Sequence, residues 1–167
     1  MNAAAIEGKE VIIVREFDAP RDLVWGVWTE KEHIEKWFGP KGFDTRVDHL
    51  EFIEGGEIRH TMVGPDGTEY PSKGIFLKID APRKLVTSDE FGEGIDQIEA
   101  FKNVRLPEGM VTTVELEDIG ERCRLKLTIS YATEEDRKRH EEMGVVEGWN
   151  STLDCLFEYL AAVHTGG

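Results

Sequence analysis

The sequence predicts an α+β fold, in which a curved antiparallel sheet of six to seven strands packs against a long C-terminal helix. Three features indicate this class. Short segments of alternating apolar and polar residues, separated by turns, run from residue 45 to residue 131. A long amphipathic stretch follows them, and two short helical segments come directly after the first predicted strand. Because strands joined by short turns form a meander, the final helix is expected to cover the concave face of one sheet.

The C-terminal stretch is predicted to form one helix over residues 133–163. Thr133 is a suitable N-cap, and the three acidic residues after it lie at the positive end of the helix dipole. Arg137–Glu142 is almost entirely charged and is expected to be solvated. The stripe expected to face the sheet consists of Val145, Trp149, Leu153, Leu156 and Leu160. Two glycines in this helix each cost about 1 kcal/mol relative to alanine, so a bend or break is expected near Met143–Glu147.

Seven strands and two short helices account for most of the remaining chain. The predicted strands are Val11–Phe17, Thr45–Ile53, Glu57–Val63, Tyr70–Ile79, Leu85–Phe91, Met110–Glu117 and Arg122–Tyr131. The predicted short helices are Arg21–Thr29 and Lys31–Phe38. Met1–Gly8 is expected to be a loose tail, and Gly92–Gly109 a long loop with one helical turn at Ile95–Phe101.

The composition is that of an acidic chain of 167 residues with a formal net charge of −14. This length predicts a single domain over residues 1–167, with an ordered core at about 10–163. The acidic surface is expected to repel phosphate, so neither nucleic acid nor an anionic membrane surface is an expected partner. No apolar run is long enough for membrane insertion and no secretory signal begins the chain, so a cytoplasmic location is expected.

No motif in the sequence assigns a metal, a cofactor or a catalytic residue. The five histidines are scattered, and two cysteines, Cys123 and Cys155, are expected to be free thiols. A P-loop, a dinucleotide-binding glycine motif and a serine nucleophile motif are all absent. A catalytic function would need an inward-facing polar residue whose pKa is shifted from its usual value. The candidates for that role are His60, Glu51, Tyr70 and Asp89.

A strongly curved sheet that wraps a helix leaves a gap between the two layers, and such a gap would be a pocket. The candidate lining residues are Trp25, Trp28, Trp37, Phe38, His60, Met62, Phe76, Trp149, Asn150 and Leu153. For the aromatic residues, the pattern is more typical of an ordinary core between helix and sheet. His60 shares its strand face with Ile58 and Met62, and the sequence leaves open whether that face or the opposite one points inward.

Three groups of residues together resemble a known family. The first is Val14–Pro20 with Val24-Trp25 and Trp37-Phe38-Gly39. The second is Glu54-Gly55-Gly56 with Met62-Val63-Gly64-Pro65-Asp66-Gly67 and Gly74-Ile75-Phe76. The third is Glu147-Gly148-Trp149 with Ser151, Leu153, Leu156 and Leu160. The set resembles proteins homologous to the C-terminal domain of the activator of the heat-shock chaperone ATPase (AHSA-like). These belong to the helix-grip, START-like superfamily (SRPBCC), which also contains the birch-pollen allergen. The resemblance covers about Val11 to Leu160 and implies a helix-grip fold.

Three functions are consistent with this resemblance and with the residues. The first is binding of a small, mostly apolar ligand in the cavity, as relatives in the superfamily do. The second is a co-chaperone-like interaction with a heat-shock chaperone, in which the acidic surface would meet a basic patch. The third is a cyclase- or hydrolase-like activity in the cavity. The sequence does not decide between a monomer and a homodimer.

Overall fold

The computed structural model describes residues 3–92, 95, 98 and 106–166. Its eight strands are β1 (Ala3–Glu7), β2 (Glu10–Phe17), β3 (Asp44–Leu50), β4 (Glu57–Val63), β5 (Glu69–Asp80), β6 (Lys84–Phe91), β7 (Met110–Asp118) and β8 (Cys123–Ser130). The helices are α1 (Arg21–Thr29), α2 (Lys31–Trp37), α3 (Glu134–Glu142) and α4 (Val145–Gly166). The strands form one antiparallel sheet in the order β1-β2-β8-β7-β6-β5-β4-β3.

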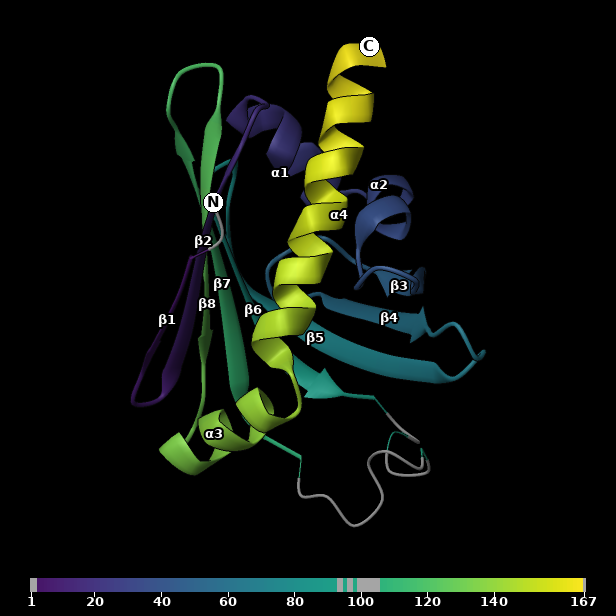
Figure 1. Cartoon of the computed structure of the whole chain (residues 1–167), viewed down its shortest axis with the longest axis vertical. Coiled ribbons are helices and arrows are strands. Elements are labelled where there is room, and N and C mark those ends of the chain that lie inside the picture. The colour runs from purple at the N-terminus through teal and green to yellow at the C-terminus, as the bar shows by residue number, and fades with distance from the viewer. Residues whose placement is uncertain (1–2, 93–94, 96–97, 99–105, 167) are drawn as a thin grey trace.

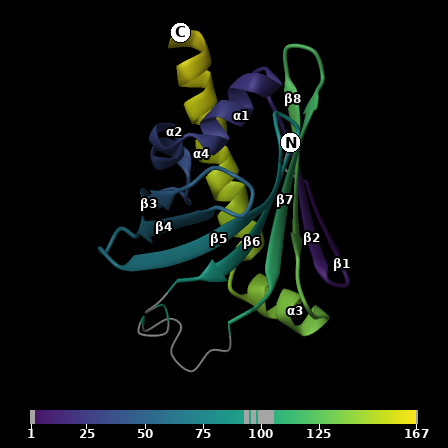
Figure 2. The same ribbon diagram turned by 180° about the vertical axis from the view of Figure 1, so that it is seen from behind.

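The sheet curves around α4, which runs along its concave face with α1 and α2 near one end and α3 at the other (Figure 1). The view from behind shows the sheet in front of these helices (Figure 2). The predicted α+β helix-grip fold is confirmed, and the seven predicted strands are β2 to β8. Register shifts between Val47 and His49 in β3, and between Phe76 and Lys78 in β5, mark bulges that bend these strands.

The inner faces of β2 and β8 supply most of the core beneath α4. On β8, Cys123, Leu125, Leu127 and Ile129 are buried and alternate with exposed or half-buried neighbours, as the strand pattern predicts. Leu153, Leu156 and Leu160 of α4 are also buried in this cluster. The apolar stripe of the helix therefore packs on the sheet as expected.

The expectation of a loose N-terminal tail is wrong for residues 3–7, which form β1. This strand pairs with β2 from Ala3 opposite Val14 to Glu7 opposite Glu10. The reversal uses a two-residue turn at Gly8-Lys9, where Gly8 has φ +50°. Glycine adopts this left-handed conformation without the steric penalty of a side chain, so the short hairpin can close.

The single C-terminal helix predicted over 133–163 is instead two helices, and the break expected near Met143–Glu147 is confirmed. Thr133 caps α3 as predicted, because its hydroxyl accepts a hydrogen bond from the Asp136 N–H at 3.0 Å. Gly144 lies between the helices with φ +88°, a conformation that ends a helix and that side chains rarely adopt. This glycine therefore separates α3 from α4.

Arg137 is buried, which corrects the expectation that Arg137–Glu142 is solvated throughout. Its guanidinium donates to the Gly8 carbonyl oxygen at 2.5 Å and pairs with Glu141. The reason for the difference is the β1–β2 turn, which lies over α3 and which the sequence pattern did not predict.

The long connection between β6 and β7 is described only in part. The helical turn predicted at Ile95–Phe101 lies mostly outside the described residues, and within it Ile95 is buried. No helix in the described part of the chain is both long and apolar enough to cross a bilayer.

Candidate functional site

A cavity of about 310 Å³ lies between the concave face of the sheet, α4 and the short helices. Most of its walls come from β4 to β7 and from one face of α4. Further residues come from α1, from α2 and the segment after it, and singly from β3, β8 and α3. Most of the lining side chains are apolar or aromatic. The volume is at the lower end of the range of about 300–1,000 Å³ that is typical of ligand sites.

Three aromatic rings form a continuous wall where α1, α2 and α4 meet. Trp28 and Trp149 are stacked with ring planes 3° apart and centroids 6.2 Å apart. Phe38 meets Trp149 edge to face at a centroid distance of 5.7 Å. Both arrangements are favourable for aromatic pairs.

The backbone of β5 approaches β6 closely on the opposite wall. A Cβ at Gly74 would lie 2.5 Å from the carbonyl oxygen of Ser88 and 2.8 Å from a Thr87 methyl carbon. Real Cβ atoms do not make such contacts, so a larger residue at Gly74 would push the two strands apart. Glycine at this position lets the cavity wall form where β5 bends.

The inward face of β4 is the one that carries His60. Ile58, His60 and Met62 line the cavity. Of the two faces of this strand, the one that carries His60 therefore points inward. The His60 ring meets Phe38 edge to face at 5.0 Å. Burial lowers the pKa of His60 to about 4, although the negative charge of Asp48 acts to raise this pKa. His60 is therefore neutral at physiological pH.

The structure brings six of the ten predicted lining residues to the cavity and places four elsewhere. The six that line it are Trp28, Phe38, His60, Met62, Phe76 and Trp149. The four that do not are Trp25, Trp37, Asn150 and Leu153. Leu153 has no exposed surface and lies in the core. It belongs to the same apolar stripe of α4 as Val145 and Trp149, which line the cavity.

The other three residues are held by contacts outside the cavity. Trp25 packs edge to face on Phe52 at 6.2 Å. Trp37 is buried and its indole N–H donates to the Val27 carbonyl oxygen at 2.8 Å, which ties α2 to α1. At Asn150, the main-chain carbonyl oxygen accepts a hydrogen bond from the Arg15 guanidinium of β2 at 3.4 Å. Helical and strand periodicity do not distinguish these packing positions from the neighbouring cavity positions.

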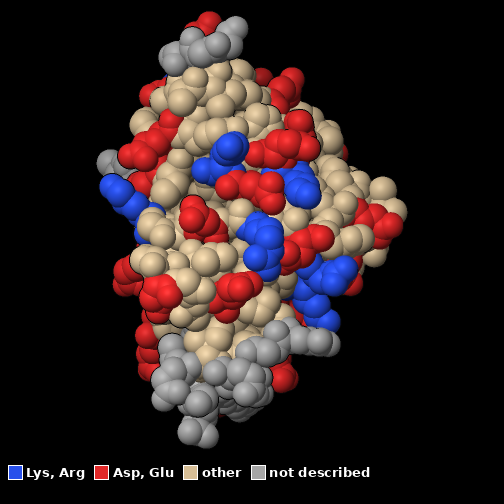
Figure 3. All heavy atoms as spheres, turned by 90° about the vertical axis from the view of Figure 1, so that its right-hand side faces the viewer, with Lys and Arg blue, Asp and Glu red and all other residues tan. Residues whose placement is uncertain are grey.

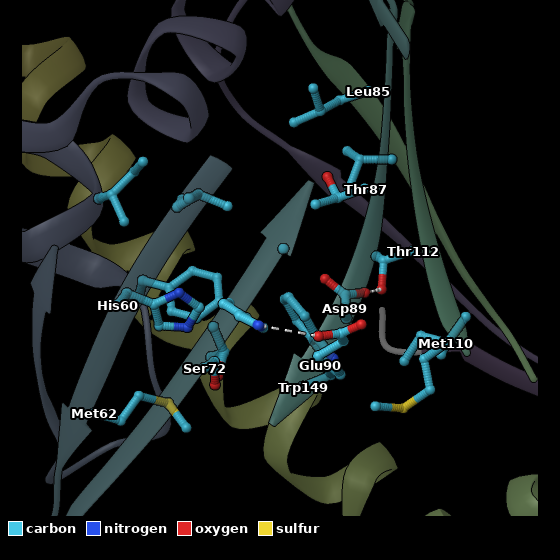
Figure 4. Close-up of a pocket in the computed structure, with 18 of the residues that line it drawn as sticks. His60, Met62, Ser72, Leu85, Thr87, Asp89, Glu90, Met110, Thr112 and Trp149 are labelled. Carbon is cyan, nitrogen blue, oxygen red and sulfur yellow. Dashed lines mark hydrogen bonds and ion pairs between the residues drawn. The ribbon is translucent and has the colours of Figure 1, made fainter. Parts of the chain in front are cut away.

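A polar group lies on the wall formed by β6 and β7. Asp89 faces the cavity and accepts a hydrogen bond from the Thr112 hydroxyl (Figure 4). Burial raises the pKa of the Asp89 carboxyl to about 7, and the Thr112 hydrogen bond opposes this rise. Asp89 shares its strand face with the lining residues Leu85 and Thr87, so strand alternation was the signal that could have placed it in the cavity.

His140 closes the same end of the cavity from α3. Its Nδ1 lies 2.7 Å from the Tyr131 hydroxyl, and burial lowers the pKa of His140 to about 4. Sequence reasoning missed this residue because it belongs to the charged segment expected to be solvated. No pattern within that segment distinguishes His140 from its exposed neighbours.

Charged side chains also meet at the rim of the cavity. Lys73 of β5 and Glu90 of β6 form an ion pair at 3.5 Å, with both side chains largely exposed (Figure 4). In the described part of the chain, no group of three or more His, Cys, Asp or Glu residues could hold a metal ion. Of the candidates named for catalysis, His60 and Asp89 line the cavity, whereas Glu51 and Tyr70 do not.

Comparison with known protein families identifies this arrangement of helix, sheet and cavity. The model of the family described as "Activator of Hsp90 ATPase homolog 1-like protein" (AHSA1) matches residues 18–161. The chain belongs to this family. The match covers α1, α2, β3 to β8, α3 and most of α4, so the cavity lies within the AHSA1 domain. No curated protein is a significant match to the chain.

Solved structures of similar proteins share the AHSA1 fold over nearly the whole chain. A protein from Arthrobacter aurescens is 28% identical with a TM-score of 0.85, and the match covers 95% of this chain and 91% of that one. A protein from Nitrosomonas europaea is 29% identical with a TM-score of 0.76, covering 94% and 97% of the two chains. The AHSA1 protein from Silicibacter pomeroyi, at 23% identity and a TM-score of 0.72, covers 93% and 99% and shares the fold.

The cavity of this AHSA1-family domain combines an apolar interior with a few separated polar groups. His60 on β4 and Asp89 on β6 are inward-facing polar residues with shifted pKa values, as a catalytic cavity would need. No hydrogen bond joins these two groups in the described structure, and the one partner of Asp89 is a threonine hydroxyl.

Proposed function

We propose that the protein binds a small hydrophobic ligand in the cavity between α4 and the sheet. The observation that carries this proposal is the cavity of about 310 Å³, lined mostly by apolar and aromatic side chains. Transfer of an apolar molecule from water to such a surface is favourable by about 25 cal/mol per Å² of apolar area buried. Trp28, Phe38 and Trp149 contribute aromatic surface to this lining.

Native mass spectrometry of the protein purified from its source cell tests this proposal directly. We expect an additional non-covalent mass that is lost when the same sample is denatured. The neutral probe N-phenyl-1-naphthylamine, followed by its own fluorescence, tests the purified protein separately. A bare native mass together with no probe binding would contradict the proposal.

Gly148 provides a variant that should close the cavity. It lies on the lining face of α4 with Val145, Trp149 and Thr152, and a Cβ built there meets no atom within 4 Å. Gly148→Leu should therefore place its side chain in the cavity and weaken probe binding by about tenfold, or about 1.4 kcal/mol. Ala162→Leu, at an exposed position of the same helix, is the matched control. Equal affinity in Gly148→Leu and the control would show that the probe binds elsewhere.

A second candidate is a co-chaperone-like interaction, which the description of the matching family favours. The face seen in Figure 3 shows acidic side chains interspersed with Lys and Arg, a pattern that supports recognition of specific charges more than general attraction to a basic partner. The test is the ATPase rate of a heat-shock chaperone with and without the protein. No change at saturating protein would exclude this candidate.

A further inference from the structure

Asp89 is the one carboxyl on the inner wall of the cavity that has no charged partner in the described structure. Its Oδ2 accepts from the Thr112 hydroxyl, which is its one hydrogen-bond partner among the described residues. The second oxygen points away from Thr112 toward the interior of the cavity (Figure 4). The other lining carboxyl, Glu90, lies at the rim and is paired with Lys73. One carboxyl oxygen in an apolar cavity is therefore left available to a ligand.

The cavity itself supplies no cation to pair with this oxygen. Among the described lining residues, the basic side chains are Lys73, His60 and His140. Lys73 is engaged by Glu90, and both histidines are neutral at physiological pH because they are buried. His140 is also hydrogen-bonded to Tyr131. A ligand that carries its own positive charge would supply the missing partner.

We propose that the ligand of this cavity is a small apolar amine, whose protonated nitrogen binds the free oxygen of Asp89. This inference rests on the proposed function, because it assumes that the cavity is the ligand site. A hydrogen bond between two ionised groups is about twice as strong as one between neutral groups, and more so away from water. The apolar part of the amine packs on the wall formed by Trp28, Phe38 and Trp149.

Three probes of one shape and different charge test the proposal: 1-naphthylmethylamine, 1-naphthalenemethanol and 1-naphthoic acid. Their dissociation constants are measured by isothermal titration calorimetry at about pH 8, where Asp89 is ionised and an alkylamine is protonated. We expect the amine to bind about tenfold more tightly than the alcohol, and the acid to bind most weakly. At about pH 5.5 the preference for the amine should be lost, because Asp89 is then protonated.

Asp89→Asn keeps the shape of the side chain and removes its charge. We expect this variant to bind the amine and the alcohol equally. Glu115→Gln removes a carboxylate from β7 on the face away from the cavity and should retain the preference for the amine. Thr112→Val removes the hydrogen bond that lowers the pKa of Asp89, so less of the carboxyl is ionised at about pH 8 and the preference for the amine should weaken.

The possible results separate this inference from the proposed function. If the alcohol binds as tightly as the amine, and Asp89→Asn changes neither, the cavity is a ligand site and the amine proposal is wrong. Tighter binding of the acid than of the amine would also overturn it, since Asp89 would then act as a protonated donor. If no probe binds and the native mass is bare, the proposed function itself fails.

Discussion

At the scale of single residues, burial sets the charge of the polar groups in the cavity. It raises the pKa of Asp89 to about 7 and lowers the pKa values of His60 and His140 to about 4. The direction differs because burial disfavours the charged form, which is the deprotonated carboxyl but the protonated imidazole. The cavity is consequently least charged between about pH 5 and pH 6, where all three groups are neutral.

Asp89→Asn should stabilise the protein, and the gain should grow as pH rises. The pKa of Asp89 is 3.8 when the chain is unfolded and about 7 when folded, so the folded state loses stability as pH rises between these values. We expect the variant to gain about 2–4 kcal/mol in free energy of unfolding at about pH 8, and little at about pH 4. Urea unfolding at both values checks this.

The comparison with the unmodified protein is needed because His60 and His140 act in the opposite sense. Their folded pKa values are lowered, so both remove stability as pH falls from about 6.5 through about 4. Both contributions are present in the variant and cancel in the difference. An equal gain in free energy of unfolding at both pH values would show that ionisation of Asp89 does not destabilise the folded state.

At the scale of elements, the two glycines near the start of α4 have different roles. Gly148 lies within the helix and a Cβ there meets nothing within 4 Å, whereas Gly144 has φ +88° between α3 and α4. Gly148→Ala should therefore raise the free energy of unfolding by about 0.5–1 kcal/mol, through helix propensity and reduced freedom of the unfolded chain. Gly144→Ala should lower it by about 1–2 kcal/mol, because alanine is strained at positive φ.

Thermal or urea unfolding of the two variants at one pH checks this pair. Each serves as the control for the other, because both add one methyl group within five residues of chain. Similar changes of the same sign in both variants would contradict the assignment of Gly144 to the helix boundary.

Arg137 connects α3 to the β1–β2 hairpin through the Gly8 carbonyl oxygen. Because the guanidinium is buried, Arg137→Ala should lower the free energy of unfolding by about 1.5–3 kcal/mol, the range for hydrogen bonds to charged groups. Lys138→Ala, next to it and largely exposed, should change it by less than about 0.5 kcal/mol. Urea unfolding measures both, and equal effects would argue against a link between the hairpin and α3.

At the scale of the whole molecule, α4 contributes to a core that extends across β2, β7 and β8. Leu156 has no exposed surface, while the adjacent Phe157 is 42% exposed. Leu156→Ala should lower the free energy of unfolding by about 2–5 kcal/mol because it leaves a cavity. Phe157→Ala should have a clearly smaller effect, although its ring lies 6.4 Å from that of Phe17.

Unfolding followed by circular dichroism and by tryptophan fluorescence should give coincident transitions in both variants, as expected for one domain. The tryptophans lie on α1, α2 and α4, whereas circular dichroism reports on all elements. Separate transitions for the two signals would contradict the prediction of a single domain over residues 1–167.

The sequence by itself determined the fold class, because strand alternation, turn residues and the amphipathic stripe are local patterns that require no knowledge of their neighbours. The cap at Thr133 and the break near Gly144 follow from the same local chemistry. The family resemblance is consistent with these patterns, and the matching family model covers residues 18–161.

Only the tertiary structure decided which residues face the cavity. Trp28 and Trp37 both lie near the C-terminal end of a short helix, yet Trp28 lines the cavity and Trp37 donates to the Val27 carbonyl oxygen. Asp89 and His140 reach the same space from β6 and α3, which are far apart in the chain. Burial and its effect on pKa depend on what packs against a side chain, and that is a property of contacts between distant segments which periodicity does not encode.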